Sequence, residues 1–224
     1  MDISASKHSV TGIYGGTFDP VHIGHMRTAV EMLEQLRLTE LRFIPSARPP
    51  HKQTNVAPFD FRLKMLEQAI HDAGFPAFVL DAREAGRRGP SYTVDTRQEL
   101  KQAFPATRLV LIMGMDAWLT LPQWHRWQVI LDLAHIAVLR RPGALAEPPK
   151  ELRDIMWRCR TDHPEHLHHT DHGLLYFADV TQFGISSSMV RSSLAADRSI
   201  RYLVPEAIQS DVEAYYKCQK ETEG

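Results

Sequence analysis

The sequence predicts an α/β fold, a doubly wound parallel sheet with helices on both faces, and three observations support this prediction. Short β-prone runs alternate with helical patterns along the chain. Continuous apolar runs such as Leu109–Met113 are typical of strands that are covered on both faces. The chain has 224 residues, of which 43% are hydrophobic and 24% charged, and this suits one domain with a sizeable core. In such a Rossmann-like fold, ligands bind at the carboxyl ends of the strands.

The first half of the chain supplies three predicted strands and three predicted helices. The strands are expected at Val10–Tyr14, Glu40–Pro45 and Phe78–Leu80. Apolar residues at helical spacing predict the first two helices: Met26, Val30, Leu33 and Leu36, then Leu63, Leu66 and Ile70. The second helix is expected to end near Gly74, and a third runs from about Tyr92 to Phe104.

The second half continues the alternation. Strands are expected at Leu109–Met113, His135–Leu139 and Leu174–Ala178, and helices at Glu151–Cys159, from Ser188, and after Pro205. Proline suits the first position of a helix, and Ile208, Val212 and Tyr215 form an apolar stripe behind it. We expect a single domain over 1–224 with an ordered core from about 10 to 216. Residues 142–172, which are rich in proline, are expected to form an insertion or long loop.

Composition excludes several classes of protein. Lys+Arg is 26 and Asp+Glu is 27, a formal net charge of −1, so bulk charge does not hold this chain on nucleic acid. No apolar run has the length of a membrane span, and the N-terminus has no signal-peptide core. Cys159 and Cys218 lie outside any CxxC pattern and are expected to be free thiols. We therefore expect a cytoplasmic protein without nucleic-acid or membrane partners, whose oligomeric state the sequence does not specify.

The segment GGTFDPVHIGH, Gly15 to His25, joins the first strand to the first helix. Gly15 and Gly16 allow the backbone to approach phosphate oxygens closely, and Thr17 adds a hydroxyl. The following helix offers unpaired N–H groups and the positive end of its dipole. His22 and His25 are three residues apart, so both imidazoles can face one side, where polyphosphate would raise their pKa values. The segment predicts a triphosphate site, against the alternative of a tight turn with two surface histidines.

A second candidate phosphate site opens the helix near the end of the chain, with the sequence ISSSMVR. Ser186, Ser187 and Ser188 are good N-cap residues, and their hydroxyls and N–H groups can hold phosphate. Arg191 lies within reach of the same helix end and offers a fork of donors. The alternative is an ordinary serine cap with a solvated arginine, but the first motif favours a second phosphate clamp.

Together the two motifs resemble the bacterial nicotinate-nucleotide adenylyltransferases of the HxGH nucleotidylyltransferase superfamily. The resemblance runs from about Thr11 to Tyr215 and includes PPHK at Pro49–Lys52, SYT at Ser91–Thr93, GMDAW at Gly114–Trp118, LPQWHRW at Leu121–Trp127 and RPG at Arg141–Gly143. It implies transfer of the adenylyl group of ATP to nicotinate mononucleotide, release of pyrophosphate, and Mg²⁺ as cofactor, held mainly through the ATP phosphates with no metal ligand named on the protein.

The resemblance also implies roles for individual residues. The expected ATP-binding residues are Gly15, Gly16, Thr17, Phe18, His22, His25, Gly114, Asp116, Ser187, Ser188 and Arg191. The expected contacts of nicotinate mononucleotide are Lys52, Tyr92, Thr93 and Trp118, with Trp118 stacking on the pyridine ring. The residues expected to act on the reacting phosphates are His22, His25, Lys52 and Arg191. Trp124 and Trp127 are interpreted as packing residues, Asp19 as a turn residue, and Arg48, Arg140 and Arg141 are left undecided.

The SYT motif favours one acceptor substrate, while the sequence leaves alternative functions open. SYT is expected at a helix N-terminus, whose N–H groups prefer a carboxylate to a neutral amide. The alternatives are an adenylyltransferase for nicotinamide mononucleotide or pantetheine phosphate, and a non-catalytic ATP-binding sensor. The histidines at 163, 166, 168, 169 and 172 also allow a metal-binding interaction protein. Their spacing matches no standard zinc finger, so we interpret them as a solvated loop.

Overall fold

The computed structural model describes residues 9–49, 56–140 and 148–222, with side chains up to Cys218. Its strands are β1 (Val10–Gly16), β2 (Glu40–Pro45), β3 (Phe78–Leu80), β4 (Arg108–Gly114), β5 (His135–Arg140), β6 (Arg160–Thr161) and β7 (Leu175–Asp179). They form one sheet in the order β3-β2-β1-β4-β5-β7-β6, and each neighbouring pair is parallel. The predicted fold class is therefore confirmed.

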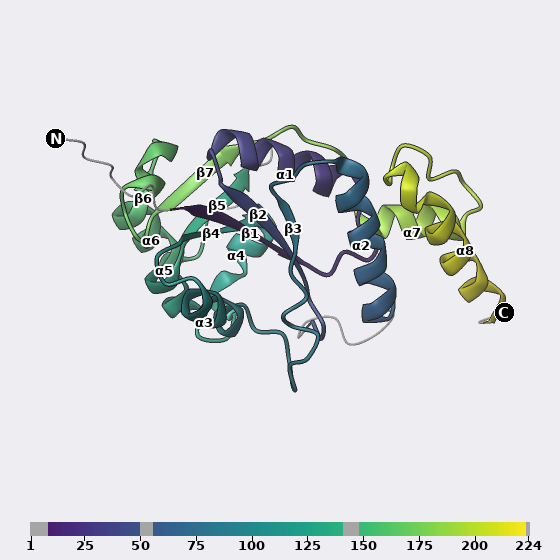
Figure 1. The fold of residues 1–224 in the computed structure, drawn as a ribbon, viewed down its shortest axis with the longest axis horizontal. Coiled ribbons are helices and arrows are strands. Elements are labelled where there is room, and N and C mark those ends of the chain that lie inside the picture. The colour runs from purple at the N-terminus through teal and green to yellow at the C-terminus, as the bar shows by residue number, and fades with distance from the viewer. Residues whose placement is uncertain (1–8, 50–55, 141–147, 223–224) are drawn as a thin grey trace.

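Helices cover both faces of this sheet (Figure 1). They are α1 (Ile23–Gln35), α2 (Phe59–Ala73), α3 (Thr93–Ala103), α4 (Met115–Leu119), α5 (Ile130–Leu133), α6 (Lys150–Cys159), α7 (Ser187–Ala195) and α8 (Glu206–Thr222). Local chemistry sets several ends: Gly74 closes α2 in the left-handed conformation at φ 67°, and Ser186 caps α7. Figure 1 shows α2, α7 and α8 together at one end of the molecule and α6 with β6 at the other.

The alternation of side chains along β4 divides the core into two layers. Val110 and Ile112 pack with residues of α1, α2, α7 and α8. Leu111 and Met113 point to the other face and pack with residues of α4, α5 and α6. Because both faces of β4 are covered, its sequence is a continuous apolar run, as predicted.

The predicted long loop is more regular than expected in its described part. Residues 148–172 contain α6, which was predicted, the two-residue strand β6 and a 3-10 turn at Pro164–His168. The strand β6 extends the sheet beyond β7. It was not predicted, because two polar residues give no periodic signal. The helices α4 and α5 were also missed, since they have only five and four residues.

The strand order places a switch point between β1 and β4. From β1 the chain continues to β2 and β3 on one side, while β4 continues to β5 and β7 on the other. The connections therefore diverge where β1 and β4 end, and in open α/β sheets this divergence leaves a crevice for ligands. The first predicted motif begins with Gly15 and Gly16, which the structure adds to the end of β1, and Gly114 ends β4.

Candidate functional site

A cavity of about 670 Å³ opens at the carboxyl ends of β1 and β4. Its walls come from the turn after β1, the end of β4, the N-terminal half of α3 and the segment Gln123–His125. Of the predicted site residues, it is lined by Gly15, Gly16, Thr17, Tyr92, Thr93 and Gly114. Six residues predicted from separate motifs thus share one cavity of a size that is ordinary for a ligand site.

The turn after β1 is shaped by the packing of Phe18. Phe18 is 2% exposed, and its ring meets Tyr14 and His25 edge-on. A Cβ on Gly16 would lie 3.1 Å from Cζ of Phe18, so the ring and a side chain at Gly16 compete for the same space. Because the Phe18 ring belongs to the core, only its backbone is available to a ligand.

The two histidines of the first motif lie against each other at the start of α1. His22 is the N-cap, and its ring stacks on that of His25 with centroids 3.6 Å apart. The backbone N–H of His22 donates to Nδ1 of His25 at 3.2 Å, so a neutral His25 carries its proton on Nε2. Nδ1 of His22 is buried and has no hydrogen-bond partner within the described part of the chain. Burial lowers the pKa of His22 to about 4, so the ring is neutral in the ligand-free protein.

The second predicted motif lies directly beside the first. Oγ of Ser187 donates to the carbonyl oxygen of Pro20 at 2.9 Å. Nη1 of Arg191 donates to the carbonyl oxygen of Asp19 and lies 3.4 Å from Oδ2 of the same residue. Ser188 is exposed at the same helix end. Two segments about 170 positions apart in the chain therefore converge at one place, as the sequence predicted.

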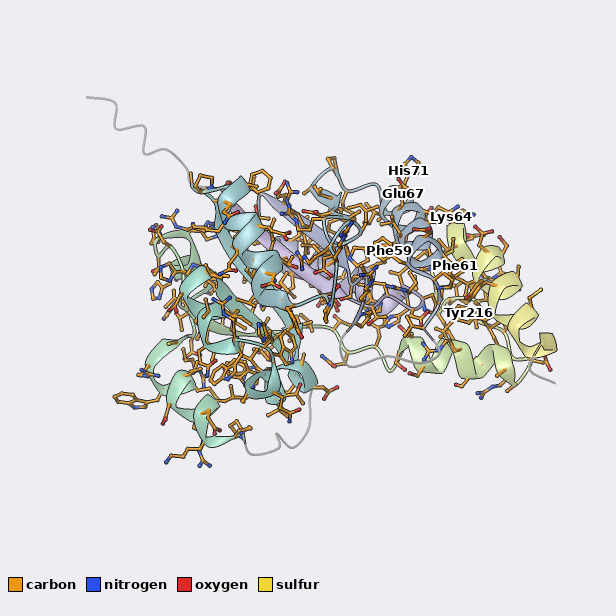
Figure 2. All side chains as sticks on the ribbon, turned by 90° about the horizontal axis from the view of Figure 1, so that it is seen from below. Phe59, Phe61, Lys64, Glu67, His71 and Tyr216 are labelled. Atoms are coloured by element: carbon orange, nitrogen blue, oxygen red, sulfur yellow. The ribbon has the colours of Figure 1, made fainter. Side chains whose placement is uncertain are left out.

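Asp19, interpreted from sequence as a turn residue, is the centre of a buried network. It is 3% exposed, and its Oδ1 accepts hydrogen bonds from Tyr216 Oη at 2.6 Å and from the backbone N–H of Ala57 at 3.2 Å. Figure 2 shows Tyr216 beside Phe61, where α8 meets α2, and their ring centroids are 6.1 Å apart. On the same side, Arg62 donates from Nη1 to the carbonyl oxygen of Thr17 at 2.6 Å. Neither the buried network of Asp19 nor the contact of Arg62 with Thr17 was predicted, because the FDP turn carries no local signal for either.

The aromatic residues at the other end of the cavity correct one prediction. Trp118 is 1% exposed and packs edge-on against Phe177, so neither face of its indole is available to a pyridine ring. Trp124, which was interpreted as packing, lines the cavity together with Tyr92. The ring of Tyr92 stacks on His125 with centroids 4.4 Å apart. Trp118 faces inward because it lies on the buried side of the short helix α4.

The remaining predicted residues lie outside the cavity or outside the described ranges. Asp116 is exposed in the first turn of α4, beyond Gly114. Lys52 and Arg141 are outside the described residues. Arg140 pairs with Asp179 at 3.0 Å, and Nη1 of Arg48 reaches the carbonyl oxygen of Arg87 at 3.4 Å.

The described histidines at 163–172 have contacts of their own. Nε2 of His168 donates to the carbonyl oxygen of Leu36 at 2.8 Å, and Nδ1 of His166 lies 2.9 Å from Oγ1 of Thr161. Among the residues that the structure describes, no group of three histidine, cysteine, aspartate or glutamate side chains could hold a metal ion. No helix in the described ranges is long and apolar enough to cross a membrane.

Comparison with known proteins gives a consistent set of relatives. The model of the cytidylyltransferase-like family matches residues 13–193. A probable nicotinate-nucleotide adenylyltransferase of Pseudomonas aeruginosa (strain UCBPP-PA14) is 45% identical over 206 residues, 92% of this chain and 95% of the relative. One of Methylococcus capsulatus is 46% identical over 197 residues, 88% of this chain and 93% of the relative.

Among solved structures, the nicotinic acid mononucleotide adenylyltransferase of Plasmodium falciparum complexed with NaAD is similar in fold. It has a TM-score of 0.70 at 16% identity and covers 93% of this chain and 96% of its own. A putative nicotinate-nucleotide adenylyltransferase from Vibrio parahaemolyticus has a TM-score of 0.61 at 13% identity, with the same coverage.

Proposed function

The chain belongs to the cytidylyltransferase-like family and, within it, to the nicotinate-nucleotide adenylyltransferases, and from this premise we propose that its site transfers the adenylyl group of ATP to nicotinate mononucleotide. A phosphate oxygen of the mononucleotide forms a bond to the α-phosphorus of ATP. The bond from that phosphorus to the bridging oxygen of the β-phosphate breaks, and pyrophosphate leaves with the electron pair. The observation that carries the proposal is the convergence of the turn after β1 with the N-terminus of α7, beside a cavity with an aromatic end.

ATP is proposed to lie with its triphosphate between these two segments. The backbone of Gly15–Phe18, Nε2–H of His25 and the N–H groups at the start of α7 supply donors to the phosphate oxygens. Arg191 contributes further donors, and its Nη1 is already held by Asp19. The phosphates of ATP place negative charge beside His22, which raises its pKa from the low value of the ligand-free protein. The ribose is assigned to the end of β4, at Gly114 and Asp116.

Nicotinate mononucleotide is proposed to occupy the aromatic end of the cavity. The pyridine ring lies between Tyr92 and Trp124, both of which line the cavity. Its carboxylate meets the N-terminus of α3 at Thr93, where backbone N–H groups and the helix dipole favour an anion. Lys52 remains a candidate partner for the mononucleotide phosphate on the strength of its motif alone.

Magnesium is proposed to enter with ATP, bound mainly to phosphate oxygens and water. Asp19, a buried carboxylate within the turn, is already engaged by Tyr216, Ala57 and Arg191. The described residues provide no cluster of three ligands for the ion either. This donor set fits an ion held by its substrate, whose chemistry is to neutralise part of the phosphate charge.

The protein works by alignment and by stabilising charge, since the attacking phosphate is already an anion and needs no base. Because the enzyme holds both substrates in line, bond formation becomes an effectively unimolecular step within one complex. The donors of the turn, His25 and Arg191 stabilise charge that develops on the phosphoryl oxygens. No covalent intermediate on the enzyme is required. Since both substrates are small soluble metabolites, we also propose that the enzyme works in the cytoplasm.

One assay tests the proposal. Purified protein with ATP and Mg²⁺ is offered nicotinate mononucleotide, nicotinamide mononucleotide or pantetheine phosphate, and pyrophosphate and the dinucleotide product are measured together. We expect release of one pyrophosphate per dinucleotide, fastest with nicotinate mononucleotide, and a sharp loss of turnover in His25→Ala with the fold retained. Preference for another acceptor would replace the proposed substrate. Tight ATP binding without pyrophosphate release from any acceptor would indicate a sensor instead.

A further inference from the structure

The inner wall of the cavity contains three polar residues to which the proposed reaction gives no role. Glu84, Thr96 and Arg97 all line the cavity, and they are 5%, 3% and 1% exposed. Gln123 and His125, which also line it, are exposed to solvent. The cavity therefore has an open side at Gln123–His125 and a closed, polar side formed by Glu84, Thr96 and Arg97.

Arg97 is buried in this wall without enough partners. Its Nε and Nη1 are buried and have no hydrogen-bond partner among the residues that the structure describes. Burial lowers the pKa of Arg97 to about 9, while the charge of Glu84 acts in the opposite direction, so the guanidinium remains a cation at neutral pH. Unpaired donors on a buried cation are costly, and a site that tolerates them in the empty state commonly receives an anion.

The position of Arg97 on α3 directs its charge toward the proposed carboxylate position. Arg97 follows Thr93 by four residues, so the two lie on one face of the helix, and both line the cavity. Long helical side chains lean back toward the helix N-terminus. The guanidinium and the positive end of α3 thus act on the same region. Asp95, in the same first turn of α3, is not among the residues that line the cavity.

Glu84 supplies the opposite charge in the ligand-free wall. Its Oε1 accepts a hydrogen bond from Oγ1 of Thr96 at 2.6 Å, and Thr96 in turn accepts one from Nη1 of Arg87 at 3.0 Å. Oε2 of Glu84 is buried, and no described residue gives it a hydrogen bond. The wall therefore holds one carboxylate and one guanidinium, and among the described residues Nε and Nη1 of that guanidinium have no acceptor.

We propose that Arg97 is a specificity-determining residue, which binds the carboxylate of the acceptor's pyridine ring and thereby selects the acid mononucleotide over the amide. The inference rests on the proposed function. A carboxylate presents two acceptor oxygens to the guanidinium fork, whereas a carboxamide presents one acceptor and one NH₂ group that faces other donors. Such a mismatch at a buried polar group discriminates strongly between otherwise similar substrates.

The test compares the acid and amide mononucleotides in Arg97→Leu, which replaces the guanidinium with an apolar side chain. We expect kcat/KM for the acid to fall by about 10- to 100-fold, as for loss of a buried charge-assisted hydrogen bond. The value of kcat/KM for the amide should change by less than about threefold, and KM for ATP should be unchanged. Arg108→Leu is the matched control, because Arg108 is buried and paired with Asp171 at the amino end of β4, away from the cavity. It should leave the acid-to-amide ratio unchanged.

Two further variants keep the test decisive if Arg97→Leu does not fold. Arg97→Lys retains the charge but not the guanidinium fork. The value of kcat/KM for the acid should therefore fall less than in Arg97→Leu, and kcat/KM for the amide should be unchanged. Glu84→Gln removes the competing carboxylate, so the acid-to-amide ratio should rise. A parallel loss for both acceptors in the Arg97 variants, or an unchanged ratio, would overturn the proposal.

The inference and the proposed function fail in different ways. Wild-type protein that makes no dinucleotide from any acceptor contradicts the proposed function. Calorimetric binding of the two mononucleotides, measured without ATP, still tests Arg97 in that case. Equal affinity of wild-type protein for the acid and the amide, or equal loss of both in Arg97→Leu, would contradict the role of Arg97.

Discussion

Replacing Tyr216 with phenylalanine should weaken ATP use from a position outside the substrate sites. The hydroxyl of Tyr216 donates to Oδ1 of Asp19 at 2.6 Å, and the same carboxyl group and its backbone carbonyl receive Nη1 of Arg191. Tyr216→Phe removes one hydroxyl and leaves the ring, which meets Phe61 edge-on. Asp19 then keeps only the Ala57 N–H and Arg191. Tyr216 is thus a positioning residue for the arginine at the phosphate clamp.

The magnitude follows from the burial of the carboxylate. A hydrogen bond to a buried charged group contributes about 1.5–3 kcal/mol, and removal of the donor costs that much of the free energy of unfolding. For a domain of this size that corresponds to a fall in Tm of about 3–12 °C. Because Asp19 also holds Arg191, we expect kcat/KM for ATP to fall about tenfold while KM for the mononucleotide stays within about twofold.

Steady-state kinetics with each substrate varied in turn, together with thermal unfolding, measures both effects. Tyr215→Phe is the matched control, because Tyr215 stacks on Phe61 with centroids 4.1 Å apart and phenylalanine preserves that stack. It should leave KM for ATP unchanged. The reasoning is refuted if Tyr216→Phe lowers Tm without changing ATP kinetics, or if both substrates are affected equally.

Three further predictions test other parts of the account. Burial lowers the pKa of His22 and of His135 to about 4 from the usual 6.5, so the unfolded chain binds more protons between these values and the free energy of unfolding falls as the pH falls. Between pH 7 and pH 5, denaturant unfolding should show that the free energy of unfolding falls by about 2 kcal/mol for each of the two histidines. His135→Gln should remove about half of this combined fall. Equal stability at both pH values would contradict the assignment. Trp124→Ala should raise KM for the mononucleotide about tenfold without changing KM for ATP, and the reverse pattern would place the pyridine ring elsewhere. Ser187→Ala removes the hydrogen bond to Pro20 and should raise KM for ATP about threefold; an unchanged KM would remove Ser187 from the clamp.

The strands and the two phosphate motifs could be predicted because their signals are local. The β2 and β3 ranges match the structure residue for residue, since β2 alternates polar and apolar residues before it ends at Pro45 and β3 is a short apolar run. The cap of α7 follows from Ser186, whose side chain accepts a hydrogen bond from the backbone N–H of Met189. Gly15 and Gly16 are the last residues of β1, and the missing side chain at Gly16 leaves room for the Phe18 ring. The switch point between β1 and β4 then brings the turn and Gly114 to one cavity.

The residues that were missed depend on contacts between distant segments. Asp19 and Tyr216 are 197 positions apart, and no local pattern indicates that a C-terminal helix will cover the FDP turn. Trp118 lies in the short helix α4 and Trp124 directly follows the next 3-10 turn, and the direction of these two short elements decides which indole faces the cavity. Arg97 could have been suspected from its spacing to Thr93, but helical spacing alone does not distinguish a buried arginine from a solvated one.

The central claim is that the turn after β1 and the start of α7 hold one triphosphate. A crystal structure of the protein with Mg²⁺ and a non-hydrolysable ATP analogue tests it most directly. We predict phosphate oxygens within hydrogen-bond distance of both the Gly15–Phe18 backbone and the N-terminus of α7, with the α-phosphorus facing the cavity that Tyr92 and Trp124 line. A triphosphate bound anywhere else, or held by only one of the two segments, would contradict the account.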